Sequence, residues 1–348
     1  MDQEATYGAY FQAVTDFLSW RGFHRLRKAV GVRRKLPPEG LDFSEIRVFL
    51  EKHGAFYHPA RVIAITTDFQ ESFVLNVAVS KAGGAAIQRE FALLEELNRF
   101  LPDGYLPRVY HFGKGGGSGA TRWPLFLGEW FEDFSEFHLT RDPSEGSLGI
   151  LVWDARSGVF FLSKAQTRQL YRQVALILTA YFDPSSSRHI FPWHHAAGDF
   201  VLRCQNGGLA LRLITARRFA PIVSEPRAAA ESLAEVLFFF LANLSVQTRL
   251  DRLEGVGGLV WSHDLAVAET LKGVLMGLEK KHPLLPARFI AYLGSFSREE
   301  VGDFFKAVLE TLDHRAPEFS LIGKHLEDHS GLMYDEVQKH ACRLKDTT

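Results

Sequence analysis

The stretch HIFPWHHAAGDFVLRCQNGGLALRLITARRF, residues 189–219, holds the densest polar cluster of the chain in an otherwise apolar setting. The cluster consists of three histidines and one aspartate, namely His189, His194, His195 and Asp199. An apolar run at 200–202 is followed by an Asn-Gly-Gly turn at 206–208 and by a second apolar run at 209–214. Two apolar runs around an Asn-Gly turn predict a β-hairpin. We therefore expect a polar loop that leads directly into a hairpin.

The composition is typical of a globular protein with a sizeable core. The chain has 348 residues, 46% hydrophobic and 13% aromatic, which is enough for one large domain or two small ones. The formal net charge is -1, so no overall positive field indicates a nucleic-acid partner. The locally basic segment 21–35 is interpreted as a solvated helix face and loop.

The sequence features that report on location favour the cytoplasm and no membrane partner. Cys204 and Cys342 lie far apart and outside any metal-spaced pattern, which argues against a disulfide framework. The N-terminus is polar and acidic, unlike a secretory signal. The most apolar window, 233–244, is too short to cross a bilayer.

Hydrophobic periodicity predicts strands mixed with helices first and mainly helices later. Gly22 should interrupt the first helix, and the glycine-rich run 113–119 predicts a flexible connection, with nucleotide binding as a weaker alternative. The expected helices are 5–30, 43–53, 85–101, 164–182, 227–245, 264–281, 285–294, 298–314 and 334–344. The expected strands are 55–57, 61–66, 73–80, 106–112 and 124–131, followed by hairpins at 148–162 and 199–214.

This order of elements and the local sequence resemble the aminoglycoside/choline phosphotransferase branch of the protein-kinase-like superfamily, over roughly residues 55–275. The resemblance implies a two-lobed α+β fold with a small antiparallel-sheet lobe and a mainly helical large lobe. The implied boundaries are 1–53 for an N-terminal helical extension, 54–140 for the small lobe and 141–348 for the large lobe. It also implies ATP and Mg²⁺ as ligands.

The resemblance implies nucleotide-binding positions in the first part of the chain. A strand lysine should hold the phosphates, but Asn76 occupies the matching position and carries no charge. Lys81 either replaces that lysine, with Glu95 as its partner, or is an exposed loop cation. Glu90 matches the glutamate that orients the lysine, or it is a solvated carboxylate.

The implied adenine-contacting segment follows the strand 124–128 and contains Glu129 and Phe131. Such contacts use backbone N–H and C=O groups, so residue type carries little information. The aromatic side chains of this segment can stack on a base or belong to the core.

The implied catalytic loop has an aspartate base and, five residues later, an asparagine that binds the metal. Aligning Gly198-Asp199 with the family's Gly-Asn places His194 at the base position and Asp199 at the metal position. An aspartate supplies oxygen ligands for Mg²⁺. The imidazole of His194 or His195 can act as a general base.

The second metal position departs most from the family. Thr215 occupies it, and a neutral hydroxyl is a poor substitute for a carboxylate on Mg²⁺. Arg217 and Arg218 follow and bring positive charge, which suits an anion such as a phosphate. Together with Asn76 and His194, Thr215 therefore favours a pseudokinase-like protein.

Three functions remain open on these residues. The leading hypothesis is a regulatory, non-catalytic pseudokinase that binds a nucleotide or small phosphorylated ligand in the cleft between its lobes. The alternatives are a divergent phosphotransferase on a small hydroxylated molecule, with His194 or His195 as base and Asp199 on the metal, and a scaffold subunit with a protein partner. The histidine cluster itself indicates either a Zn²⁺ or Fe²⁺ site or loop histidines that bond backbone carbonyls.

Overall fold

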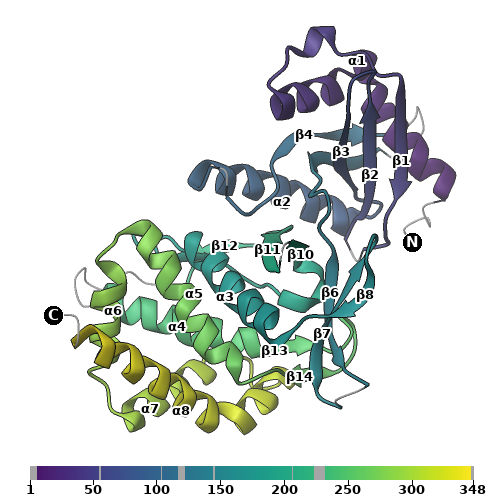
Figure 1. Cartoon of the computed structure of the whole chain (residues 1–348). Helices are drawn as coiled ribbons and strands as arrows, with labels where there is room; N and C mark the ends of the chain where they lie inside the picture. Colours follow the sequence, from purple (N-terminus) through teal and green to yellow (C-terminus); the bar gives the residue numbers. More distant parts are fainter. Residues whose placement is uncertain are drawn as a thin grey trace. The chain divides into compact units, whose positions relative to one another are not determined.

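Two compact units, Met1–Glu132 and Asp133–Thr348, make up the chain (Figure 1). The computed structural model describes residues 6–54, 56–102, 104–116, 122–143, 146–205, 207–222 and 232–345. The predicted α+β fold class is confirmed, with an N-terminal helix, an antiparallel-sheet unit and a mainly helical unit. Among these described residues, no helix combines the length and the apolar character needed to cross a membrane.

A five-stranded antiparallel sheet with the order β1-β2-β3-β5-β4 forms the centre of unit 1. Side chains alternate across its two faces. Leu125 and Leu127 of β5 join the core beneath α1, while Phe126 between them contacts Phe91 of α2. Helices therefore cover both faces. The elements are α1 (Tyr7–Arg34), β1 (Glu45–Leu50), β2 (His58–Ile65), β3 (Gln70–Val77), α2 (Lys81–Phe100), β4 (Val109–Gly115) and β5 (Trp123–Glu129).

The segment predicted as a helix over 43–53 is instead the edge strand β1. It pairs antiparallel with β2 over its whole length. Ile46, Val48 and Leu50 are half-buried and alternate with exposed residues, which is the period of a strand. The helix prediction relied on Ile46, Phe49 and Leu50, a spacing that a short alternating strand also contains. Pairing with β2 decided between the two patterns.

The helix α1 is interrupted at Trp20–Phe23, where the backbone leaves helical geometry. The predicted interruption at Gly22 is therefore confirmed, and Gly22 itself has φ +64, a value that glycine adopts without strain. Apolar residues from both helical segments, among them Phe17 and Leu26, are fully buried in the core of unit 1. Both segments of α1 thus contribute to that core.

The glycine-rich run was predicted as a flexible connection, yet Gly113 and Gly115 belong to strand β4. A Cβ atom built on Gly115 would lie 2.0 Å from the carbonyl oxygen of Ala13. Glycine is needed there because α1 approaches the strand so closely. Residues 117–119 lie outside the described part. The strand predicted over 55–57 is also wrong, since 56 and 57 lie in a connection and 55 is not described.

Unit 2 combines short strands with packed helices. Its predicted hairpin is confirmed. Strands β10 and β11 pair from Phe200, opposite Leu213, to Gln205, opposite Gly208. The strand β6, which pairs with β7, was not predicted. The helix predicted over 298–314 ends at Leu309 in the structure, and the helix predicted over 334–344 begins already at Pro317. The elements are β6 (Glu136–Arg141), β7 (Leu148–Asp154), β8 (Gly158–Phe161), α3 (Lys164–Ala180), β9 (Arg188–Ile190), β10 (Phe200–Gln205), β11 (Gly208–Leu213), β12 (Phe219–Pro221), α4 (Ser232–Arg249), β13 (Leu250–Arg252), β14 (Leu259–Trp261), α5 (Leu265–Lys281), α6 (Leu285–Leu293), α7 (Arg298–Leu309) and α8 (Pro317–Lys345).

Candidate functional site

The predicted catalytic loop forms one turn of π-helix, His195–Asp199, between β9 and β10. Asp199 ends this turn and is buried, with 2% of its surface exposed. The backbone N–H of His194 donates a hydrogen bond to Asp199 Oδ2 over 2.8 Å. The carboxylate therefore closes the loop on itself. The π-helix is rare in proteins, and where a single turn of it occurs, it often lies at a functional site.

Arg217 supplies the opposite charge for Asp199. Its Nη1 donates to Oδ2 over 2.6 Å and its Nη2 donates to Oδ1 over 2.5 Å. This two-point contact is the fork geometry in which a guanidinium binds a carboxylate most strongly. Both oxygens that would ligate a metal ion are engaged by this pair.

His195 lies on the inner side of the loop and is fully buried. Its Nδ1 atom is 2.9 Å from Oδ2 of Asp251, on strand β13. The same oxygen accepts the backbone N–H of Ala196 over 2.8 Å, and Asp251 Oδ1 accepts the backbone N–H of Arg252 over 2.7 Å. Burial by itself would raise the pKa of Asp251, but His195 and these two donors outweigh it and hold that pKa below its usual value. Asp251 is thus an ionised anchor for the loop.

The remaining histidines do not gather into a metal site. His189 lies in β9, where its Nδ1 is 3.2 Å from the carbonyl oxygen of Ala220 on the paired strand β12. Burial lowers the pKa of His189 to about 4, so the ring is neutral at pH 7. Within the ranges that the structure describes, no group of three or more His, Cys, Asp or Glu residues is arranged to hold a metal ion.

The residues present do not fit Mg²⁺. A magnesium site needs oxygen ligands, usually from one or two carboxylates. Asp199 faces Arg217 instead, and Thr215, a half-buried residue just after β11, brings no charge. Arg218 is exposed beside them and adds a further positive charge. The local charge favours an anion over a cation.

The predicted nucleotide-binding residues of unit 1 lie on three elements. Asn76 is buried in β3, opposite Phe126 of β5. Lys81 is the exposed first residue of α2 and forms no ion pair within the described part of the chain. Glu90 is buried on the same helix, 8% exposed. The ion pair between a strand lysine and a helix glutamate that the resemblance implies is therefore not formed by Lys81.

The predicted adenine-contacting segment is tied to its own unit. Glu129 ends β5, and its Oε2 accepts the backbone N–H of Arg108 over 3.2 Å. Its Oε1 lies 3.8 Å from Nη1 of Arg33. Phe131 follows in the connection and is half-buried. These contacts hold the end of β5 against the end of α1.

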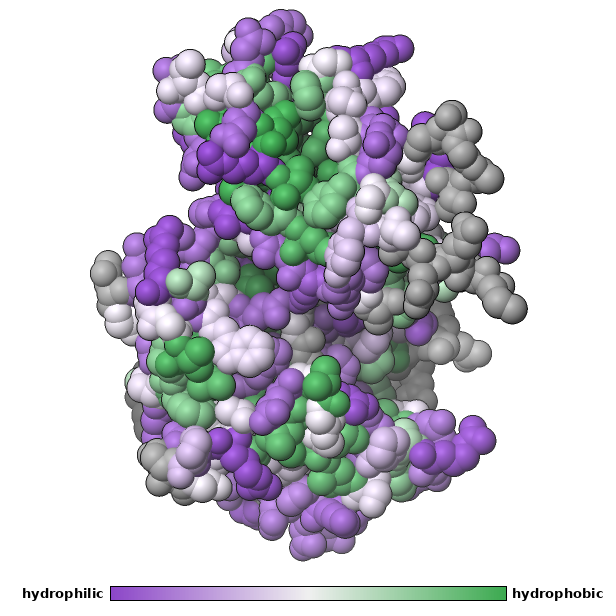
Figure 2. Space-filling model, turned by 90° about the vertical axis from the view of Figure 1, so that its right-hand side faces the viewer, coloured by the Kyte–Doolittle hydropathy of each residue, from purple (hydrophilic) through white to green (hydrophobic). Residues whose placement is uncertain are grey.

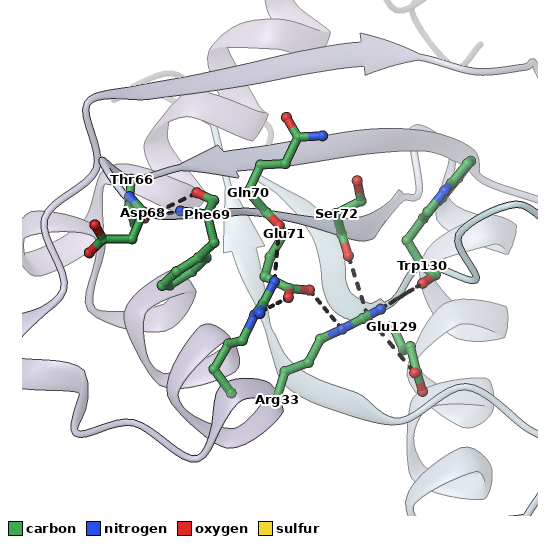
Figure 3. Close-up of polar contacts among 10 residues, drawn as sticks. Arg33, Thr66, Asp68, Phe69, Gln70, Glu71, Ser72, Glu129 and Trp130 are labelled. Carbon is green, nitrogen blue, oxygen red and sulfur yellow. Dashed lines mark hydrogen bonds and ion pairs between the residues drawn. The ribbon is translucent and has the colours of Figure 1, made fainter.

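A cluster around Arg33, which sequence reasoning missed, lies at this point (Figure 3). Arg33 Nε is 2.8 Å from Oε2 of the buried Glu71, and Arg34 pairs with the other oxygen of that carboxylate. Arg33 Nη1 also donates to the carbonyl oxygen of Trp130 over 3.3 Å. The roles of Glu71 and Asp251 could not be predicted from neighbouring residues, because their side-chain partners lie dozens of residues away along the chain.

No protein-family model and no curated protein matches the chain. Solved structures match at low identity. WaaP in complex with acyl carrier protein is 11% identical, with a TM-score of 0.32 over 71% of this chain and 86% of that one. Rad53 1-466 in complex with AMP-PNP is 14% identical, with a TM-score of 0.31 over 85% and 65%. Choline kinase from Cryptosporidium parvum Iowa II is 10% identical, with a TM-score of 0.37 over 92% and 95%. Similarities at these scores carry no assignment of activity.

Proposed function

We propose that this chain is a kinase-like protein with a degraded catalytic set, which binds a ligand in a regulatory role and does not transfer phosphoryl groups. The observation that carries the proposal is the two-point contact between Arg217 and Asp199. Arginine stays protonated at any physiological pH. A metal ion would have to displace a permanent cation from a carboxylate that is 2% exposed.

The position of His195 supports the same conclusion. A general base must come within hydrogen-bond reach of the hydroxyl that it deprotonates. His195 is fully buried and lies against Asp251, so it supports the loop from inside. His194 is half-buried and uses its backbone N–H to bond Asp199.

The ligand class that suits these residues is a nucleotide or a small phosphorylated molecule bound without divalent metal. The side chain of Arg217 is 40% exposed even while it pairs with Asp199, and Arg218 is exposed beside it. Guanidinium groups recognise phosphate oxygens through paired N–H donors. In such a complex the arginine guanidinium groups, instead of a metal ion, would offset the negative charge of the phosphate.

The test is thermal unfolding with ATP, ADP or GTP, each with and without Mg²⁺ or Mn²⁺. A ligand that binds only the folded protein raises the midpoint. We expect a shift that does not depend on metal and that is reduced in Arg218→Ala. A shift seen only with metal would contradict the proposal. In that case the second candidate, a phosphotransferase with His194 as base, gains support from its placement beside the Asp199 carboxylate.

A protein partner is the third candidate, and exposed aromatic residues favour it. Tyr7, Phe49 and Phe56 of unit 1 are 64%, 49% and 53% exposed, and Figure 2 shows apolar side chains gathered on one face of this unit. Exposed apolar patches often mark interaction sites. The absence of a shift with any nucleotide would move the assignment to a scaffold subunit.

A further inference from the structure

A buried carboxylate on α5 collects three cations. Glu269 is 1% exposed. Its Oε1 accepts from Arg168 Nη1 over 3.2 Å and from Lys272 Nζ over 3.0 Å, and its Oε2 accepts from Arg172 Nε over 2.7 Å. Arg168 and Arg172 come from α3, one turn apart. We refer to these four residues as the Glu269 cluster.

Close packing of α3 against α5 brings the cluster together. A Cβ atom built on Gly273 would lie 2.2 Å from the carbonyl oxygen of Arg172, and one built on Gly277 would lie 2.6 Å from Cβ of Thr179. Two glycines on α5 thus let its backbone approach α3. The carboxylate of Glu269 is thereby fixed where both arginines reach it.

The cluster carries more positive charge than the carboxylate can neutralise. One buried carboxylate is balanced by a single cation, so the cluster keeps a net charge of about +2. The side chains of Arg168, Arg172 and Lys272 are 42%, 36% and 35% exposed. Arg172 Nη2 also contacts Glu269 Oε2, at 2.6 Å, whereas Nε and Nη2 of Arg168 have no acceptor within the described residues. Donors already held in place therefore face solvent.

Helix α8 lies close to Lys272 of the cluster. The pKa of His340 is lowered by burial, by the charge of Arg343 and by that of Lys272, with Glu336 opposing the effect. Glu336 is itself paired with Lys339 over 2.6 Å. His340 therefore stays neutral at pH 7 and adds no charge to the cluster.

We propose that the Glu269 cluster binds the phosphate group of a small phosphorylated molecule. Glu269 fixes the two guanidinium groups, so little side-chain entropy is lost when an anion binds. Guanidinium groups pair with phosphate oxygens through parallel N–H donors, and the Lys272 ammonium adds a mobile point charge. This site is separate from the loop at Asp199 and does not depend on the function proposed for that loop.

The experiment is calorimetric titration of the full chain with inorganic pyrophosphate in a low-salt buffer. We expect binding that weakens about tenfold in Arg168→Ala and again in Lys272→Ala, and that weakens with added salt. Both side chains are partly exposed, so the variants should fold, as circular dichroism would check. Lys306→Ala is the matched control, because Lys306 pairs with Asp303 on α7.

Two results would overturn the proposal. One is an absence of pyrophosphate binding to the wild-type chain at low salt. The other is binding that survives Arg168→Ala and Lys272→Ala unchanged, since the anion would then bind elsewhere. In the second case the three cations would serve only to neutralise the charge of Glu269.

Discussion

Arg217 holds both oxygens of the Asp199 carboxylate, at 2.6 and 2.5 Å, at the open end of the β10–β11 hairpin, where Asp199 precedes β10 and Arg217 follows β11. The hairpin brings its own ends together, so residues 18 positions apart meet at the loop. A charge that would attract a metal ion is thereby neutralised within the same short segment.

Removing this arginine should create a metal response. In Arg217→Ala the carboxylate of Asp199 loses its fixed partner, and we expect Mn²⁺ to raise the unfolding midpoint where it does not raise that of the wild-type chain. The variant should also be less stable by about 1–2 kcal/mol without metal, because a buried carboxylate loses its counter-charge. Differential scanning calorimetry measures both effects. Arg218→Ala is the control, and an equal Mn²⁺ response in both variants would argue against the assignment.

Asp251 should matter more for stability than its place outside the loop suggests. Asp251→Ala removes the carboxylate that lies against the buried His195 ring and leaves the N–H groups of Ala196 and Arg252 without their acceptor. We expect a loss of about 3 kcal/mol in the free energy of unfolding, with a smaller loss in Asp251→Asn. Urea unfolding gives the comparison. Equal stability of Asp251→Ala and the wild-type chain would contradict the anchoring role.

The buried His329 predicts a loss of stability in acid. Burial and the nearby charge of Arg249 lower the pKa of His329 from its usual 6.5 to about 3. Between these two values the unfolded chain binds a proton that the folded chain does not, so stability falls as pH falls, by up to about 1.4 kcal/mol per pH unit.

In His329→Gln, whose amide can still contact Ser245, this dependence should be shallower by about one proton. Urea unfolding at pH 7, 5.5 and 4.5 measures it. His314→Gln serves as the control because His314 is exposed. An unchanged slope in His329→Gln would show that the acid sensitivity comes from other groups.

The contact between Arg33 and Glu71 should stabilise unit 1. A double-mutant cycle with Arg33→Ala and Glu71→Ala should give a coupling of about 1–2 kcal/mol, because Glu71 is buried and the pair is only partly screened. The same cycle on Arg47 and Glu45, an exposed pair, should give a coupling near zero. Urea unfolding of each single and double variant provides the values. A negligible coupling at Arg33 would mean that Arg34 alone balances Glu71.

Local patterns were enough to predict much of the fold. The hairpin at 199–214 and the helices around it follow from periodicity and turn residues, which are properties of neighbouring positions. Strand β1 was mistaken for a helix because six residues contain too few repeats to separate the two periods. Pairing with β2 makes this segment a strand, and the residues of β2 lie outside the segment 43–53 from which the helix was predicted.

Contacts between polar side chains were harder to predict than the hairpin and the helices. The approach of Arg217 to Asp199 was not foreseen, although both residues had been singled out, because the sequence gives no distance across the hairpin. Asp251 was not singled out, since its role depends on β13 lying beside the loop from 55 positions away. The predicted roles of His194, Asn76 and Glu90 remain predictions.

The contact between Arg33 and the carbonyl oxygen of Trp130 spans 97 positions, and this has a consequence during synthesis. Helix α1 leaves the ribosome before the sheet that covers its apolar side, and strand β5 of that sheet begins about 90 residues after α1 ends. Until β5 is made, Phe17, Leu26 and Val30, all fully buried in the finished fold, lack part of the sheet that they share a core with. For that interval the nascent chain keeps part of the apolar side of α1 uncovered, which makes it a substrate for chaperones that recognise apolar segments.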